Sequence, residues 1–259
     1  MLNFEQLGGT NPVHSSFNPR EIFQALPKIG GKFQYPRDVQ SQVWTKWYPI
    51  RDTSNLVIKM NTGGGKTSVG LLILKSCLNE KKGPAVYVVP DNYLVNQVVL
   101  EAKQLGIETT SNPHDPRYLS GNSILVINIH KLVNGKSVFG IDDEGIKVPI
   151  GSIIIDDAHA CLDTVEQQFT MEIPKDSHLY NELFSIFSSV LEKQSYAKYH
   201  ELLGDDPSAF LQVPFWSWQK QLASVTQLLV KHKYDKNIEF SYPLIKNHLQ
   251  LANCVFSAS

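Results

Sequence analysis

Eight consecutive residues of this sequence have the composition of a turn that binds phosphate. Residues 60–67 contain three consecutive glycines, which let the backbone adopt positive φ angles and approach an anion without a Cβ in the way. Lys66 would place a positive charge at the β- and γ-phosphates, and the Thr67 hydroxyl can bind Mg²⁺. Met60 stands where the strict pattern has glycine. The spacing predicts a nucleoside triphosphate site of the Walker A type, with phosphate contacts from Thr62, Gly63, Gly64, Gly65, Lys66 and Thr67.

The flanking residues predict the elements that hold this turn. Residues 56–60 form a short apolar run that predicts a buried strand, and residues 68–78 carry apolar side chains at helical spacing. A glycine-rich hairpin or linker turn is the plain alternative. A strand before the turn and a helix after it favour the phosphate-binding loop, because the helix N-terminus adds exposed N–H groups and a positive dipole.

A pair of aspartates follows another apolar run. Residues 152–155 predict a strand buried on both faces, and Asp156 and Asp157 come directly after it. In an open α/β sheet the ligand crevice lies at the carboxyl ends of the strands. Asp156 could hold the Mg²⁺ of the phosphate loop, and Asp157 could orient or deprotonate an attacking water. The same pair could instead cap a helix at residues 158–162, but the phosphate loop upstream favours catalysis.

The remaining periodicity predicts an α/β fold. Strands at residues 85–89 and 123–127 alternate with helical stretches, which indicates a mostly parallel sheet flanked by helices. Asn18 and Pro19 start a short helix, and residues 39–47 form another with one buried face. On that helix Gln40 is either a plain surface glutamine or a reader of the adenine edge, since its amide both donates and accepts.

Composition limits the class of protein. The chain has 259 residues, 42% of them apolar, and a net charge of −1, so DNA or RNA would have to bind in a local groove. Its three cysteines lie far apart and form neither a disulfide framework nor a metal set. The sequence has no signal peptide and no apolar stretch of about 18 residues. It predicts a cytoplasmic protein that does not bind membranes.

These pieces together resemble the first RecA-like domain of a superfamily 2 helicase of the DEAD/DEAH-box type. The resemblance extends from about residue 36 to residue 259. Residues 60–67 resemble motif I, the run Asp156-Asp157-Ala158-His159 resembles motif II, and residues 35–40 look like the adenine-reading segment. Residues 88–91 resemble motif Ia and residues 128–132 stand where motif Ib falls. The run Ser257-Ala258-Ser259 is similar to motif III.

The resemblance implies roles for individual residues. Gln40 would read adenine, and ATP with Mg²⁺ would be the ligand, the metal being shared by Thr67 and Asp156. The residues implied in catalysis are Lys66, Asp156, Asp157 and His159. Those implied in nucleic-acid contact are Pro90, Asn92, Gln97, His130 and Lys131, and those implied in coupling are Ser257 and Ser259. Two positions depart from the family: Asp157 stands for glutamate, and Ser259 for threonine.

The resemblance also implies a domain plan. An N-terminal helical extension is expected at 1–34, the RecA-like core at 35–162, a helical insertion at 163–250, and the last core strand with motif III at 251–259. Helices at 179–203 and 218–233 are expected in the insertion. Its Trp216, Trp218 and residues 231–233 would either face a nucleic-acid strand or anchor the insertion and end a solvated helix.

The expected activity is ATP hydrolysis coupled to movement along nucleic acid. It should be weak in this chain, because the second RecA-like domain and its arginine are missing. A P-loop NTPase that remodels or senses proteins without unwinding is the alternative, which the near-neutral charge favours slightly. The sequences of motifs I and II also resemble those of bacterial helicases. Some of these helicases belong to antiviral defence systems and act with a partner protein of the same operon.

Overall fold

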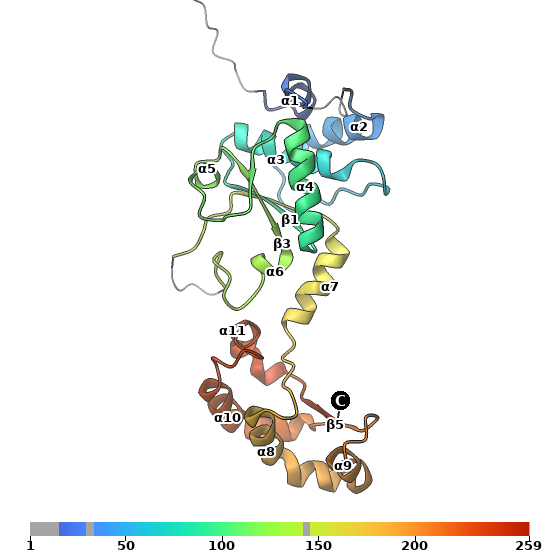
Figure 1. Ribbon diagram of the computed structural model, residues 1–259, viewed down its shortest axis with the longest axis vertical. Helices are drawn as coiled ribbons and strands as arrows, with labels where there is room; N and C mark the ends of the chain where they lie inside the picture. Colours follow the sequence, from blue (N-terminus) through green and yellow to red (C-terminus); the bar gives the residue numbers. More distant parts are fainter. Residues whose placement is uncertain (1–15, 30–33, 142–145, 259) are drawn as a thin grey trace, which may run out of the picture. The chain divides into compact units, whose positions relative to one another are not determined.

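The computed structural model describes residues 16–29, 34–141 and 146–258 of the chain. They fall into two compact units, drawn in Figure 1. Unit 1 holds the described residues within 1–132 and 145–162, and unit 2 holds those within 133–144 and 163–259. No helix among the described residues is long and apolar enough to cross a membrane.

Unit 1 is built on a four-stranded parallel sheet flanked by helices. Its strands are β1 (Ala85–Val89), β2 (Thr109–Thr110), β3 (Ile124–Asn128) and β4 (Ser152–Ile155), in the spatial order β2-β3-β1-β4. Its helices are α1 (Pro19–Ala25), α2 (Asp38–Trp47), η2 (Tyr48–Ile50), α3 (Lys66–Asn79), α4 (Asn92–Leu105), α5 (Pro116–Leu119) and α6 (Ile129–Leu132). The predicted α/β architecture with a parallel sheet is thereby confirmed.

The core of unit 1 lies between the sheet and the helices α3 and α4. Alternate residues of β1 and β3 point into it, among them Tyr87, Val89 and Val126. On α3, Val69 and the run 71–74 are buried against the same face. Figure 1 shows α3 and α4 beside these strands. The long apolar stretch of α3 is therefore a core helix, and only its first turn belongs to the phosphate loop.

The strand predicted at residues 56–60 is not formed. This segment carries no strand assignment, and the side chains of Leu56, Val57 and Ile58 are exposed. Strand structure needs a hydrogen-bonded neighbour, and β4 pairs only with β1 among the described strands. The strand β4 lies at an edge of the described sheet. It is not buried on both faces as predicted, since the side chains of Ile153 and Ile155 are 43% and 45% exposed.

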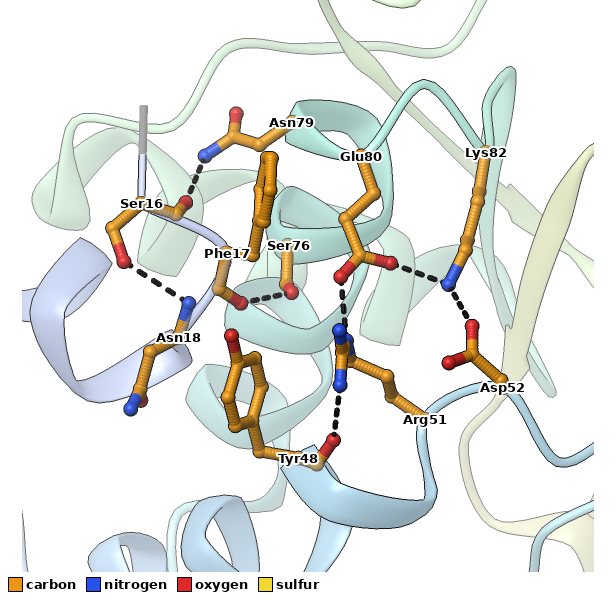
Figure 2. Close-up of polar contacts among 10 residues, drawn as sticks. All are labelled: Ser16, Phe17, Asn18, Tyr48, Arg51, Asp52, Ser76, Asn79, Glu80 and Lys82. Carbon is orange, nitrogen blue, oxygen red and sulfur yellow. Dashed lines mark hydrogen bonds and ion pairs between the residues drawn. The ribbon is translucent and has the colours of Figure 1, made fainter. Parts of the chain in front are cut away.

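A charged network fixes the other end of α3, as Figure 2 shows. Glu80 follows the helix and accepts hydrogen bonds from Arg51 Nε, at 2.5 Å, and from Lys82 Nζ. Lys82 also contacts Asp52 at 2.6 Å, and Arg51 Nη1 donates to the carbonyl of Tyr48 at 2.9 Å. The network ties the loop after η2 to the helix end.

The N-terminal segment is held to the same end of α3. The Ser76 hydroxyl donates to the Phe17 carbonyl, and Asn79 Nδ2 donates to the Ser16 carbonyl at 2.8 Å. Asn18 then caps α1, because its side chain accepts from the N–H of Arg20. The predicted start of the short helix at residues 18 and 19 is confirmed.

Unit 2 is mainly helical and has its own core. It contains most of α7 (Ala158–Gln168), then α8 (His178–Gln194), α9 (Tyr196–Leu203), α10 (Phe215–Lys231), α11 (Tyr242–Ile245) and η3 (Lys246–Leu251), with strands β5 (Phe210–Gln212) and β6 (Val255–Ser257). The single helix predicted at 179–203 is two helices, because the chain becomes extended at Ser195. The helix predicted at 218–233 begins earlier, at Phe215.

The last strand does not complete the core sheet. We expected residues 251–259 to join the RecA-like sheet, but β6 pairs antiparallel with β5 in unit 2. Phe256 explains this pairing, since its ring is buried in the core of unit 2 and meets Tyr180 edge-on at 5.4 Å. Burial of an aromatic side chain of this size stabilises the position of β6 in unit 2.

The two tryptophans of α10 differ in burial. Trp218 is an anchor, because it is buried and its indole N–H donates to the Leu249 carbonyl at 2.8 Å. Trp216 is exposed. At the end of the helix, Lys231 and His232 both contact the Glu182 carboxylate, at 2.6 and 2.8 Å. These two side chains are thus engaged within unit 2.

The charged network predicts a measurable loss of stability in Glu80→Gln. The Glu80 side chain is only 10% exposed, so removing its charge leaves Arg51 without its anion and Lys82 with Asp52 alone. We expect the free energy of unfolding to fall by about 1–3 kcal/mol in denaturant titrations. Glu108→Gln is the matched control, since its side chain is 72% exposed and lies 3.5 Å from Arg117. It should change stability by less than about 0.5 kcal/mol.

The same comparison should depend on pH. Burial opposes the charged form of Glu80, but the hydrogen bonds from Lys82 and Arg51 outweigh it and lower the pKa of this carboxyl. A lowered pKa gives stability that is present above the usual glutamate range and is lost as the pH falls through the folded-state value. The difference between wild type and Glu80→Gln should therefore shrink in acid. A difference that grows in acid would contradict this assignment.

Candidate functional site

The glycine-rich turn leads directly into the N-terminus of α3. Gly63 and Gly65 have φ angles of +80° and +77°, which only glycine adopts without strain, and Gly65 is the N-cap of the helix. The N–H of Gly64 donates to the Asn61 carbonyl at 3.1 Å and closes the turn. No side chain caps α3, so its first N–H groups stay available at the positive end of the helix dipole. This arrangement suits an anion.

The start of α2 holds the turn from one side. Arg37 Nη1 donates to the Gly63 carbonyl, and Gln40 Nε2 donates to the Gly65 carbonyl at 3.2 Å. Gln40 Oε1 accepts from the Arg37 N–H at 2.9 Å, and the Gln40 side chain is buried. Each end of the amide therefore has one partner inside the protein. One N–H and one lone pair remain for the predicted adenine contact.

The second predicted motif stands at the end of β4. The N–H of Asp156 donates to the Val88 carbonyl at 2.9 Å, which continues the pairing with β1. Asp157 has a φ of +49°, a left-handed conformation that aspartate tolerates better than most residues, and it is exposed. Its carbonyl accepts from the Cys161 N–H at 3.0 Å at the start of α7, where His159 is also exposed.

A buried tyrosine connects the two motifs. The Tyr87 hydroxyl donates to Asp156 Oδ2 at 2.9 Å, and the Thr67 side chain is a polar neighbour of the same phenol that acts to lower its pKa. Asp156 Oδ1 accepts from the N–H of Asp157 at 3.0 Å. Burial raises the pKa of Tyr87 well above its usual value, and the adjacent Asp156 charge raises it further. The phenol therefore stays protonated and acts as a donor at neutral pH.

These contacts bring together the two predicted metal ligands. Asp156 accepts a hydrogen bond from the Tyr87 phenol and Thr67 neighbours the same phenol, although the two residues come from different motifs. A hydroxyl and a carboxylate are oxygen ligands of the kind Mg²⁺ takes from proteins, alongside water and phosphate. Among the described residues, no cluster of three or more His, Cys, Asp or Glu side chains could hold a metal by itself. The donor set therefore fits a metal that arrives with a phosphate ligand.

Most of the predicted nucleic-acid residues follow the carboxyl ends of β1 and β3, whereas Gln97 lies within α4. The two strands are neighbours, with Val89 opposite Asn128. Asn128 Nδ2 donates to Asn92 Oδ1 at 2.8 Å, and Asn128 Oδ1 accepts from the Lys131 N–H at 3.0 Å. The fold therefore brings Pro90 and Asn92 beside the 130–131 stretch. Of the predicted set, the exposed residues are Asn92, Gln97, His130 and Lys131.

The predicted coupling residue Ser257 does not belong to the unit that holds the phosphate loop. Ser257 lies in β6, opposite Phe210, and belongs to unit 2, whereas the phosphate loop and Asp156 belong to unit 1. Ser259 is outside the described residues. Their coupling role stays a prediction.

Sequence reasoning did not identify three residues that shape this site. They are Arg37, Tyr87 and Gly70. A hydroxyl in an otherwise aliphatic strand was the available signal for Tyr87, because a buried polar group needs a partner. A glycine inside a helix was the signal for Gly70, whose added Cβ would lie 2.7 Å from Tyr87 Cε2. Arg37 gave no local signal, since its contact with the loop is tertiary.

The glycine turn gives a matched pair of variants. Alanine at Gly63 or Gly65 meets the same left-handed strain, about 1–2 kcal/mol. At Gly63 the added Cβ has no atom within 4 Å, whereas at Gly65 it would lie 2.3 Å from Gln40 Nε2. Gly65→Ala should therefore lose about 1–3 kcal/mol more unfolding free energy than Gly63→Ala. Equal losses in chemical denaturation would show that Gln40 does not press against the loop.

Comparison with known proteins agrees with this geometry. A model of the family described as DEAD/DEAH box helicase matches residues 37–188, which include Gln40, the phosphate loop and Asp156. The chain matches no curated protein and no solved structure. Members of this family bind ATP with a metal ion and act on nucleic acid, in keeping with the open N-terminus of α3 beside Asp156. The match spans more than half of the chain, which therefore belongs to the DEAD/DEAH box helicase family.

Proposed function

We propose that this chain is the ATP-binding part of a nucleic-acid translocase or helicase, in which unit 1 hydrolyses ATP. The observation that supports this most strongly is the hydrogen bond from Tyr87 to Asp156, which places this carboxylate near Thr67 and the open N-terminus of α3. A turn that only binds phosphate has no need of a carboxylate there. A carboxylate beside a phosphate-binding loop is useful when a cation accompanies the anion.

ATP would bind with its phosphates over the glycine turn. The N–H groups of the turn and of the first turn of α3 would donate to phosphate oxygens, and Lys66, which is exposed, would reach the β- and γ-phosphates. Gln40 would read adenine with the N–H and lone pair that its contacts with Gly65 and Arg37 leave over. Because Gln40 is hydrogen-bonded to the Gly65 carbonyl, the glycine turn and Gln40 would then move together.

Thr67 and Asp156 would hold the metal that comes with ATP. Mg²⁺, when bound, neutralises charge that develops on the phosphates during transfer. Asp157 would orient the attacking water or take its proton, since its carboxylate is exposed next to Asp156. Because aspartate is one methylene shorter than the glutamate usual in the family, we expect slow hydrolysis. His159 and Ser257 would relay the state of the γ-phosphate to the nucleic-acid side.

A DNA or RNA strand would follow the carboxyl ends of β1 and β3. Pro90, Asn92 and Gln97 would contact it from one side and His130 and Lys131 from the other, chiefly through its phosphates. We further propose that a second RecA-like domain supplies an arginine. Such an arginine raises the rate of hydrolysis by about 10³–10⁵ in related NTPases, so the chain alone should hydrolyse ATP slowly. A role in bacterial antiviral defence, with a partner protein, rests only on the resemblance of motifs I and II.

ATP binding should depend on Lys66. Lys66→Ala removes the point charge at the phosphates, and loss of a charge-assisted hydrogen bond corresponds to about 10–100-fold weaker binding. Isothermal titration calorimetry with ATP and Mg²⁺ measures this directly. Lys59→Ala is the control, since Lys59 is also exposed but precedes the glycine turn. Equal affinity of Lys66→Ala and wild type for ATP would show that the proposed site is wrong.

Nucleic-acid binding should depend on Lys131. If this side chain contacts a phosphate, Lys131→Ala should weaken binding of labelled single-stranded DNA or RNA similarly for all sequences. It should also reduce the slope of log K against log salt by about 0.7, as measured by fluorescence anisotropy. Lys103→Ala, an exposed lysine in the last turn of α4, is the control.

The same titrations separate the two functions. The near-neutral net charge of −1 gives a slight reason to consider an NTPase that remodels or senses proteins. Absence of binding to single strands, duplex DNA and RNA at every salt concentration, with ATP binding intact, would favour that function over the helicase.

A further inference from the structure

Tyr87 stands where it can reach both halves of the nucleotide site. It lies in the middle of β1, opposite Ile154 of β4. Asp156 is two residues further along β4 and so faces the same side of the sheet, about 6.6 Å beyond Ile154. A tyrosine that leans along its strand spans that distance, and its hydroxyl meets Asp156 Oδ2 at 2.9 Å. A shorter polar side chain in β1 would not reach.

The ring of Tyr87 fits against the first turns of α3. Its exposed fraction is 1%, and a Cβ added to Gly70 would lie 2.7 Å from its Cε2 and 3.3 Å from its hydroxyl oxygen. Glycine inside a helix costs about 0.5–1 kcal/mol relative to alanine, so Gly70 makes room for this ring at a cost in helix stability. The absence of a side chain at Gly70 lets the phenol oxygen approach Thr67, three residues earlier in the helix.

We propose that Tyr87 is a positioning residue, whose hydroxyl holds Asp156, beside Thr67, in the arrangement that accepts a metal–nucleotide complex. This inference rests on the proposed function, because it gives Thr67 and Asp156 their role as metal ligands. The phenol donates to Asp156 Oδ2 at 2.9 Å, and the Thr67 side chain is a polar neighbour of the same phenol. The hydrogen bond orients the carboxylate of Asp156.

A purely structural role would require only the ring. Phenylalanine fills the same space between β1 and α3, and it would avoid burying a hydroxyl, which costs free energy unless the group is hydrogen-bonded. The hydroxyl is bonded, and the carboxylate that accepts from it is one of the proposed ligands. Groups that orient the ligands of a metal typically contribute about 10–100-fold to metal affinity or activity. The expected effect of removing the hydroxyl is therefore on the metal-dependent part of nucleotide binding.

Tyr87→Phe isolates this effect, and Tyr118→Phe is its matched control. Tyr118 is as buried as Tyr87, but its hydroxyl donates to the Pro149 carbonyl at 2.6 Å. The full chain of each variant is titrated with ADP and with a non-hydrolysable ATP analogue, in EDTA and over a range of Mg²⁺. Tyr87→Phe should need about tenfold more Mg²⁺ for half-maximal enhancement of binding, with unchanged affinity in EDTA. Tyr118→Phe should match wild type in both respects.

Two further variants test whether the Tyr87 hydroxyl acts through Asp156. Asp156→Asn removes the carboxylate, so adding Tyr87→Phe to it should produce no further change in the Mg²⁺ requirement. Gly70→Ala keeps the hydroxyl but displaces the ring, and should raise the Mg²⁺ requirement in the same direction. Thermal unfolding of each variant confirms that it folds. If Tyr87→Phe does not fold, Gly70→Ala alone decides between the two outcomes.

The two proposals fail in different ways. If wild type binds no nucleotide with or without Mg²⁺, the proposed function is wrong. If wild type binds with a Mg²⁺ enhancement that Tyr87→Phe and Gly70→Ala both retain in full, the ATP site stands and the positioning role of Tyr87 is wrong. An effect of Tyr87→Phe that persists undiminished in the Asp156→Asn background would also overturn it, because the hydroxyl would then act through another group.

Discussion

The parallel pairing of β1 with β4 is the interaction on which the rest of the site depends. It places Ile154 opposite Tyr87, and thereby puts Asp156 on the face of the sheet that α3 covers. A shift of one residue in this register would turn Asp156 to the opposite face, since side chains alternate along a strand. The helix that carries Thr67 packs against the same two strands, so one register sets both halves of the site.

The helix α3 is held at both ends by contacts from the segment that precedes it. Near its start, Arg37 and Gln40 donate to carbonyls of the glycine turn. Beyond its end, Arg51 of the preceding segment pairs with Glu80, which Lys82, after the helix, also contacts. The loop from Arg51 to the glycine turn includes the exposed apolar residues 56–58. Anchoring at two points allows the turn to keep its shape even though the run before it forms no strand with the described part of the sheet.

Unit 2 shows how one aromatic residue can decide where a strand belongs. Phe256 lies among rings of α8, at 5.4 Å from Tyr180 and 5.2 Å from Phe184. These contacts, with the pairing to β5, keep β6 within unit 2. The exposed face of the same two strands carries Phe210 and Val255, so the strand pair covers its apolar surface on one side only.

The sequence by itself determined the class of fold, the phosphate loop and the aspartate pair, because glycines, helix periodicity and apolar runs are local signals. It identified helices such as α2 and α4 and strands β1, β3 and β4. Only the tertiary structure decided which apolar runs find a partner: residues 56–60 do not pair, and β6 pairs in unit 2. Contacts between residues distant in the chain also lay beyond the sequence, as with Tyr87 and Asp156, because a hydrogen bond across two strands depends on their register.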